Sequence, residues 1–202
     1  MIHQKMKNIE PAIYNSKKNM EKYEANSDSE QSETEEASTA EVISNKNLLK
    51  EIEETLNSII SKTEKDKKTG DKITPFDHKH IPRISIYDYL FRIQKYTGIE
   101  NNTIIIALIY IDRICTKKNI ILNKHNIHRI LVSAILVSIK YNEDHICDNL
   151  YFSKVAGVSL KELNHLECKF LEIINYDLFV SEELFQKYNE YLSNNENNEI
   201  DE

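Results

Sequence analysis

The chain has 202 residues, a formal net charge of -7, and only three glycines and three prolines. Barrels, sandwiches and doubly wound sheets use glycine and proline in their many turns, so this composition argues against them and favours a helical protein. The acidic balance argues against binding to nucleic acid, which requires a basic surface. The apolar runs are far shorter than the about 20 residues that span a bilayer. The sequence therefore predicts an all-α protein with no nucleic-acid partner and no membrane partner.

The cysteines indicate the compartment. Cys115, Cys147 and Cys168 are odd in number and lack the CxxC spacing of many metal and redox sites. This pattern favours a reduced, intracellular protein. We expect to find it in the nucleus, the cytoplasm or both.

The N-terminal segment is predicted to be disordered over residues 1–41. Its second half, EKYEANSDSEQSETEEASTAE, is acidic, rich in serine and threonine, and nearly without apolar side chains. Such a segment cannot bury enough surface to offset its conformational entropy. A solvated acidic tail is the favoured interpretation. The alternative is a set of sites for acidophilic kinases at Ser27, Ser29, Ser32 and Thr34.

A helix is predicted over residues 42–62, where apolar side chains recur at helical spacing. A charged stretch, TEKDKKTGDK, follows it and precedes Pro75. We expect the helix to dock on the remainder of the chain through its apolar residues, which are Leu48, Leu49, Ile52, Leu56, Ile59 and Ile60.

Five further helices joined by short loops are predicted over residues 84–98, 101–118, 125–144, 150–156 and 159–178, with a sixth, amphipathic helix over 181–192. The second and third of these are apolar on nearly every side, so we expect them at the centre of a compact bundle. Gly98 is placed to end the first helix, and Ser159 with Glu162 forms a capping box at the start of the fifth.

Two charges on the predicted core helices need an explanation. At 100° per residue, Glu167 lies in the apolar stripe of its helix, between Leu163 and Leu171. An unpaired carboxylate there would cost several kcal/mol or be neutralised, so Glu167 must have a partner in the protein or on another molecule. Lys140 ends the apolar run 130–139, where a lysine also suits the helix dipole and ordinary end-capping is an alternative.

A second pair of charges is expected to be structural. Asp112 follows Leu108 and Ile109 on one face of the most apolar helix, and Arg83 precedes the first core helix. A buried carboxylate is stable when it is paired with a cation. We therefore favour a buried ion pair between Arg83 and Asp112.

Residues 81–192 contain five sequence motifs whose order and spacing match those of a known protein family. The motifs are IPRISIYDYLFRIQKYT, ALIYIDRI, NIHRILVSAILVSIKYNED, LYFSKVAGVSLKELNHLE and FLEIINYDL. Together they resemble a cyclin box, and most closely that of the single-box P/U-type cyclins related to the fungal phosphate-response cyclin. No single motif would suffice, because each one alone is typical of an apolar helix.

The resemblance implies a five-helix cyclin box with flanking N- and C-terminal helices and disordered tails. The expected organisation is a disordered acidic N-terminal segment (1–41), an amphipathic helix plus charged linker (42–77), the cyclin box with its C-terminal helix (78–193) and a disordered tail (194–202).

The resemblance also implies a regulatory subunit that is not an enzyme. Such a subunit binds and activates a cyclin-dependent protein kinase, as a heterodimer, by positioning the mobile helix of the kinase. Lys140 and Glu167 match the residues that grip the kinase, and the kinase helix would be contacted by Tyr141, Tyr176 and Leu178. Arg83 and Asp112 match the structural ion pair of the family.

Two other functions compete with this interpretation. One is a cyclin-fold adaptor or scaffold protein, related to transcription, without a kinase partner. The other is a metal site or an enzyme, since three pairs have the spacing of metal ligands: His125 with His128, His145 with Cys147, and His165 with Cys168. Surface histidines and a buried, apolar Cys168 explain these pairs better. We expect no metal, no cofactor and no catalytic residue.

Overall fold

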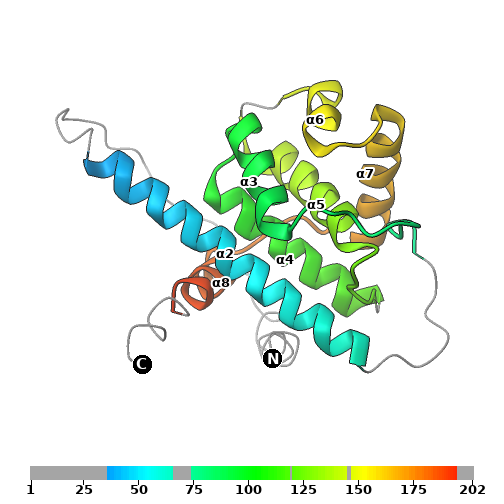
Figure 1. Cartoon of the computed structure of the whole chain (residues 1–202), viewed down its shortest axis with the longest axis horizontal. Coiled ribbons are helices and arrows are strands. Elements are labelled where there is room, and N and C mark those ends of the chain that lie inside the picture. The colour runs from blue at the N-terminus through cyan, green and yellow to red at the C-terminus, as the bar shows by residue number, and fades with distance from the viewer. Residues whose placement is uncertain (1–35, 66–73, 119, 145–146, 195–202) are drawn as a thin grey trace, which may run out of the picture.

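The computed structural model describes residues 36–65, 74–118, 120–144 and 147–194. Within these ranges every regular element is a helix, which confirms the all-α prediction. The helices are α2 (Glu36–Lys65), α3 (Ile86–Thr97), α4 (Asn101–Lys118), α5 (Ile127–Asn142), α6 (Asn149–Ala156), α7 (Leu160–Ile174) and α8 (Glu182–Asn194). Figure 1 shows α2 crossing one face of the bundle, with α6 and α7 on one side and α8 on the opposite side.

The centre of the bundle is formed by α4 and α5, as their composition predicts. Residues 130–139 of α5 are all buried. A helix that is apolar on every side is stable only when neighbours cover each side, and α4 and α7 both pack against α5. The hydroxyl of Ser138 donates to the Thr103 carbonyl of α4 over 2.9 Å, so even a polar residue in this core has an acceptor.

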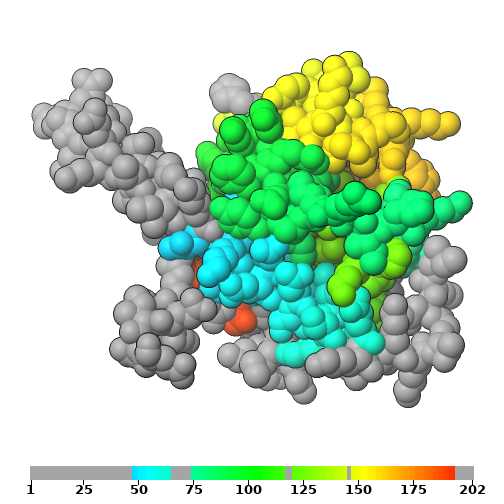
Figure 2. Space-filling model, viewed as in Figure 1, coloured from blue at the N-terminus to red at the C-terminus, as the bar shows by residue number. Residues whose placement is uncertain are grey.

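The helix α2 docks on the bundle through the apolar face that the sequence predicts. Leu49, Ile52, Leu56 and Ile60 are at most 3% exposed, and the helix packs against α3 and α8. Figure 2 shows α2 lying against α3 on this face of the molecule. Polar contacts add to this packing, because Thr63 Oγ1 donates to the Leu122 carbonyl over 2.8 Å.

Helix ends follow the capping signals in the sequence. The hydroxyl of Ser159 accepts a hydrogen bond from the Glu162 main-chain N–H over 3.1 Å, and this bond fixes the first turn of α7. Gly98 adopts a left-handed φ of 70° directly after α3, a conformation that glycine adopts without strain. The glutamate side chain of the expected capping box turns away and pairs with Arg129 of α5.

Two helix boundaries differ from the predicted ones. α2 begins at Glu36, so residues 36–41, which we expected in the disordered segment, are helical, in keeping with the helix propensity of alanine and glutamate. α7 ends at Ile174, earlier than the expected residue 178, because Asn175 and Tyr176 have φ values of 59° and 54°. Left-handed residues at this point stop the helix and redirect the chain.

Part of the predicted organisation lies outside the described residues. This holds for the proposed phosphorylation sites Ser27, Ser29, Ser32 and Thr34, for residues 66–73 of the charged linker, and for residues 195–202 of the tail.

Candidate functional site

The structure brings Lys140 and Glu167 together. Lys140 lies in the last turn of α5, and its Nζ is 2.6 Å from Oε1 of Glu167 in the middle of α7. The lysine side chain is 33% exposed and the glutamate side chain 14% exposed, so the pair lies at the edge of the core. The partner that the sequence requires for Glu167 is therefore a residue of the same chain.

A third residue, Asn149, completes this cluster. Its Nδ2 lies 3.2 Å from Oε2 of Glu167, so both oxygens of the carboxylate accept a hydrogen bond. Asn149 is the first residue of α6, which begins where Asp148 caps the helix by accepting from the Tyr151 N–H. The sequence analysis did not identify Asn149, because its role depends on how α6 lies against α7.

The other expected contact residues include two exposed tyrosines. Tyr141 follows Lys140 and is 53% exposed, and Tyr176 is 68% exposed. Leu178 is only partly buried and packs against the core. Exposed aromatic side chains are common anchors of protein interfaces because they supply a large contact area at low entropic cost.

The segment 175–180, here named the connector, joins α7 to α8 and carries two of these residues. Two side chains of α4 hold its main chain. Tyr110 Oη donates to the Leu178 carbonyl over 2.8 Å. Arg113 donates through its two terminal nitrogens to the carbonyls of Asp177 and Phe179, over 2.7 Å each. The connector is thus fixed to the bundle while Phe179, 70% exposed, lies at the surface.

The sequence analysis missed Tyr110, Arg113 and Phe179. Arg113, like Asp112, is a charged residue within an otherwise apolar helix. This interruption of the apolar pattern could have identified Arg113 from the sequence. Burial raises the pKa of Tyr110 above its usual value, although a hydrogen bond with Asn142 and the positive charge of Arg113 act in the opposite direction. Tyr110 is therefore a neutral hydrogen-bond donor at physiological pH.

The expected ion pair between Arg83 and Asp112 is absent from the described residues. Arg83 is exposed in the segment before α3, whereas Asp112 accepts a hydrogen bond from Tyr188 Oη of α8 over 3.0 Å. α8 packs directly against α4, so a tyrosine of α8 occupies the position beside the carboxylate. Asp112 therefore contacts α8 and not the segment that precedes α3.

The residues considered as metal ligands do not form a site in the part of the chain that the structure describes. There, no group of three His, Cys, Asp or Glu side chains is arranged to hold a metal ion. Cys168 is exposed, contrary to expectation, because the buried stripe of α7 runs through Leu163, Leu166 and Phe170 and leaves Cys168 on the outer side. His145 lies outside the described residues. No described helix is long and apolar enough to cross a membrane.

A protein-family model described as Cyclin matches residues 7–178. The chain belongs to the cyclin family. The match covers the helices that carry Lys140 and Glu167 as well as most of the connector.

Individual relatives support the P/U type. The chain is 35% identical to PHO85 cyclin-7 of Saccharomyces cerevisiae over 144 aligned residues. The alignment covers 64% of this chain and 50% of that protein. The chain is 38% identical over 120 residues to Cyclin-U2-2 of Arabidopsis thaliana, covering 59% and 52%. It is 39% identical over 119 residues to the PHO85 cyclin-like protein psl1 of Schizosaccharomyces pombe, covering 58% and 49%. The chain thus spans about half the length of these curated relatives, and the resemblance to P/U-type cyclins is confirmed.

Proposed function

We propose that this cyclin is a non-catalytic regulatory subunit that binds and activates a cyclin-dependent protein kinase. The observation that carries the proposal is the pair of Lys140 and Glu167, two oppositely charged side chains held together at the edge of the core, with the exposed Tyr141 next to Lys140 in the chain. Kinase activity requires that a glutamate of a mobile helix pairs with the lysine that positions ATP. A protein that binds that helix in its active position shifts the kinase towards the active state.

The pair suits this role because its groups are oriented before a partner arrives. Both oxygens of the Glu167 carboxylate accept hydrogen bonds, from Lys140 and Asn149, and these contacts hold the carboxylate in one place. A carboxylate and an ammonium group at one site can bind main-chain N–H and C=O groups at the end of a helix. Because they are already fixed, less entropy is lost on binding.

The apolar part of the interface would come from Tyr141, Tyr176 and Leu178. Tyr141 lies next to Lys140 on α5, and the connector carries Tyr176 and Leu178. Truncating one member of a desolvated charge pair in an interface costs about 2–5 kcal/mol, because the other charge is left without a partner. The charged pair would therefore determine the affinity, with the aromatic residues excluding water around it.

The test uses two glutamates of the same helix. Glu167→Gln removes the charge in the proposed interface, whereas Glu172→Gln is the matched control. Glu172 pairs with Lys169 on the outer side of α7, over 2.7 Å, and its side chain is 55% exposed. The full chain would be used to isolate its kinase from the source cells by affinity purification, with the kinase identified by mass spectrometry.

Each purified variant would then be titrated into the isolated kinase, and binding and substrate phosphorylation would be measured. We expect Glu167→Gln to weaken kinase binding by about thirtyfold or more, as a loss of at least 2 kcal/mol requires, and Glu172→Gln to leave binding unchanged. Equal binding by both variants would show that the pair is not the kinase-binding site. Isolation of a transcription complex without a kinase would instead support the adaptor function.

A further inference from the structure

The two most exposed large apolar side chains of the described residues lie three positions apart, in the connector. Phe179 is 70% exposed and Tyr176 is 68% exposed, whereas the next, Tyr96, is 55% exposed. Single exposed apolar residues are common on protein surfaces, but a concentration of them indicates an interaction site. Tyr176 belongs to the expected kinase contacts, which leaves the exposure of Phe179 to be explained.

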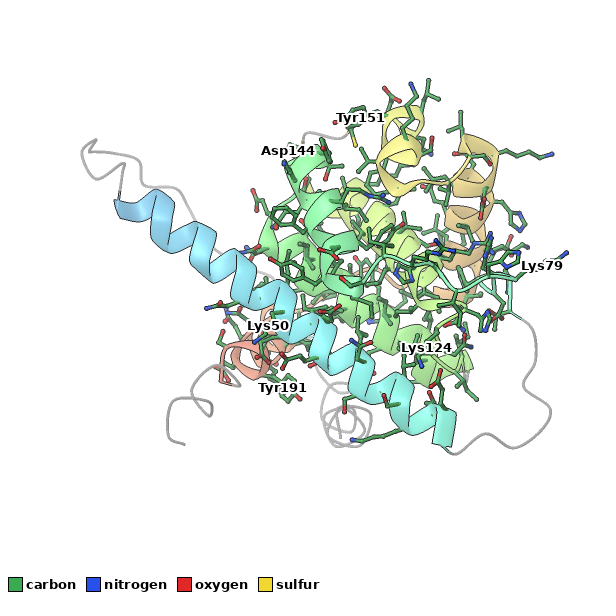
Figure 3. All side chains as sticks on the ribbon, in the orientation of Figure 1. Lys50, Lys79, Lys124, Asp144, Tyr151 and Tyr191 are labelled. Carbon is green, nitrogen blue, oxygen red and sulfur yellow. The ribbon has the colours of Figure 1, made fainter. Side chains whose placement is uncertain are left out.

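The connector crosses the bundle from α7 to α8 with the Phe179 ring on its outer side. Figure 3 shows α6, marked by Tyr151, and α8, marked by Tyr191, on opposite sides of the bundle. Leu178 and Val180 pack against the core, while Phe179 between them is exposed. Such an alternation is typical of an extended segment, in which successive side chains point to opposite sides. The ring of Phe179 therefore points away from the bundle.

Three successive main-chain carbonyls of the connector are held by one helix. Tyr110 of α4 donates to the Leu178 carbonyl over 2.8 Å, and Arg113, one turn later, donates to the carbonyls of Asp177 and Phe179 over 2.7 Å each. The Arg113 guanidinium carbon lies 5.9 Å from the centre of the Tyr110 ring, so the two donors also contact each other. The carbonyls before and after the Cα atom of Phe179 are both bonded, and the ring thus projects from a fixed point.

An exposed ring on a fixed main chain is suited to be an anchor in an interface. Phenylalanine has no hydrogen-bonding group in its side chain, so the ring gains free energy only when it leaves water for an apolar environment. Its side chain has only two rotatable bonds and its main chain is ordered in advance, so little entropy is lost when the ring is buried by a partner. Aromatic side chains are accordingly enriched in protein interfaces.

We propose that Phe179 binds in an apolar pocket of the kinase, as a second anchor beside the pair of Lys140 and Glu167. The proposal rests on the proposed function. The kinase is the occupant because the connector directly continues α7, which carries Glu167, and also carries the expected contact Tyr176. The two anchors differ in chemistry. The charged pair binds main-chain groups, which every helix has, whereas Phe179 requires apolar side chains opposite it and makes binding depend on the sequence of the kinase.

The test titrates the full chain and its variants into the kinase isolated with it. Binding and substrate phosphorylation at saturation are measured, together with the Tm of each variant alone. Phe179→Ala removes the ring, and Phe179→Leu keeps a smaller apolar side chain. The control is Phe91→Ala on α3, whose ring is 39% exposed and stacks on Tyr87 outside the connector. Glu167→Gln is measured alongside, so that the proposed function is tested separately.

We expect Phe179→Ala to weaken kinase binding at least about tenfold, and Phe91→Ala to weaken it less than about twofold. Phe179→Leu should have an intermediate effect, because it keeps part of the apolar surface. The Tm of Phe179→Ala should equal that of the wild type, since most of the ring is in contact with water in the free chain. Phosphorylation at saturation should also be unchanged, because the charged pair still positions the mobile helix.

The outcomes separate this proposal from the proposed function. Unchanged binding by Phe179→Ala, with weakened binding by Glu167→Gln, would overturn the second anchor and leave the proposed function intact. Equal losses in Phe179→Ala and Phe91→Ala would overturn it too, because the effect would not belong to the connector. A lowered Tm of Phe179→Ala would assign the ring to the stability of the free chain and not to an interface. If the full chain isolates no kinase, both proposals fail.

Discussion

Replacing Arg113 by methionine is expected to destabilise the protein and to weaken kinase binding, although Arg113 itself lies behind the proposed interface. The arginine side chain is only 15% exposed and donates two hydrogen bonds of 2.7 Å to main-chain carbonyls of the connector. Methionine keeps the aliphatic stem and removes both donors. The substitution therefore tests whether α4 holds the connector in place.

The size of the effect follows from these two bonds. A hydrogen bond to a charged group contributes about 1.5–3 kcal/mol, so the pair would contribute about 3–6 kcal/mol if both carbonyls stayed dry. Phe179 is 70% exposed and the Asp177 side chain 46% exposed, so water can reach the released carbonyls. We therefore expect the free energy of unfolding to fall by about 2–3 kcal/mol. For a protein of this size that lowers Tm by about 4–12 °C.

Thermal unfolding of the full chain measures the first effect, and titration with the isolated kinase measures the second. Kinase affinity should fall about tenfold or more, because Tyr176 and Leu178 are no longer held in position. Tyr110→Phe is the graded control, since it removes one neutral hydrogen bond worth about 0.5–1.5 kcal/mol. An unchanged Tm in Arg113→Met would refute the stability estimate. A lowered Tm with unchanged kinase affinity would refute the positioning role.

Two further predictions concern other contacts between helices. Tyr188→Phe should lower the free energy of unfolding by about 1–3 kcal/mol in denaturant titration, because it removes the hydroxyl that donates to the Asp112 carboxylate. The control is Tyr176→Phe, at a side chain that is 68% exposed, and an equally small effect of both substitutions would contradict the prediction. The pKa of His128 is lowered, chiefly by burial and further by the nearby Arg92 cation, so the unfolded chain binds the proton more readily than the folded one. Stability should accordingly fall as the pH drops below about 6.5, and this part of the pH dependence should be missing in His128→Gln.

The sequence predicted the helices well because their signals are local. Apolar residues at helical spacing identified α2 to α8, and single residues such as Ser159 and Gly98 marked helix ends. The exceptions were also local in origin, since Asn175 and Tyr176 end α7 in a left-handed backbone conformation, which asparagine favours but tyrosine rarely adopts. The family resemblance came from these same helices in their order.

The sequence also showed that Glu167 needs a partner, because the position of a residue on its own helix follows from helical geometry. Lys140 was identified beside it through the resemblance, and the structure joins the two at 2.6 Å. Asn149, the third member of the cluster, was not found, because nothing in its own helix indicates that it faces α7.

The sequence by itself determined the helical class, the central place of α4 and α5, and the need to pair the charges on the apolar helices. Only the tertiary structure decided which groups meet. Asp112 pairs with Tyr188 and not with Arg83, and Arg113 reaches the connector from another helix. The physical reason is that helical periodicity fixes the face on which a residue lies, whereas the residue opposite that face depends on the angle and offset at which two helices pack.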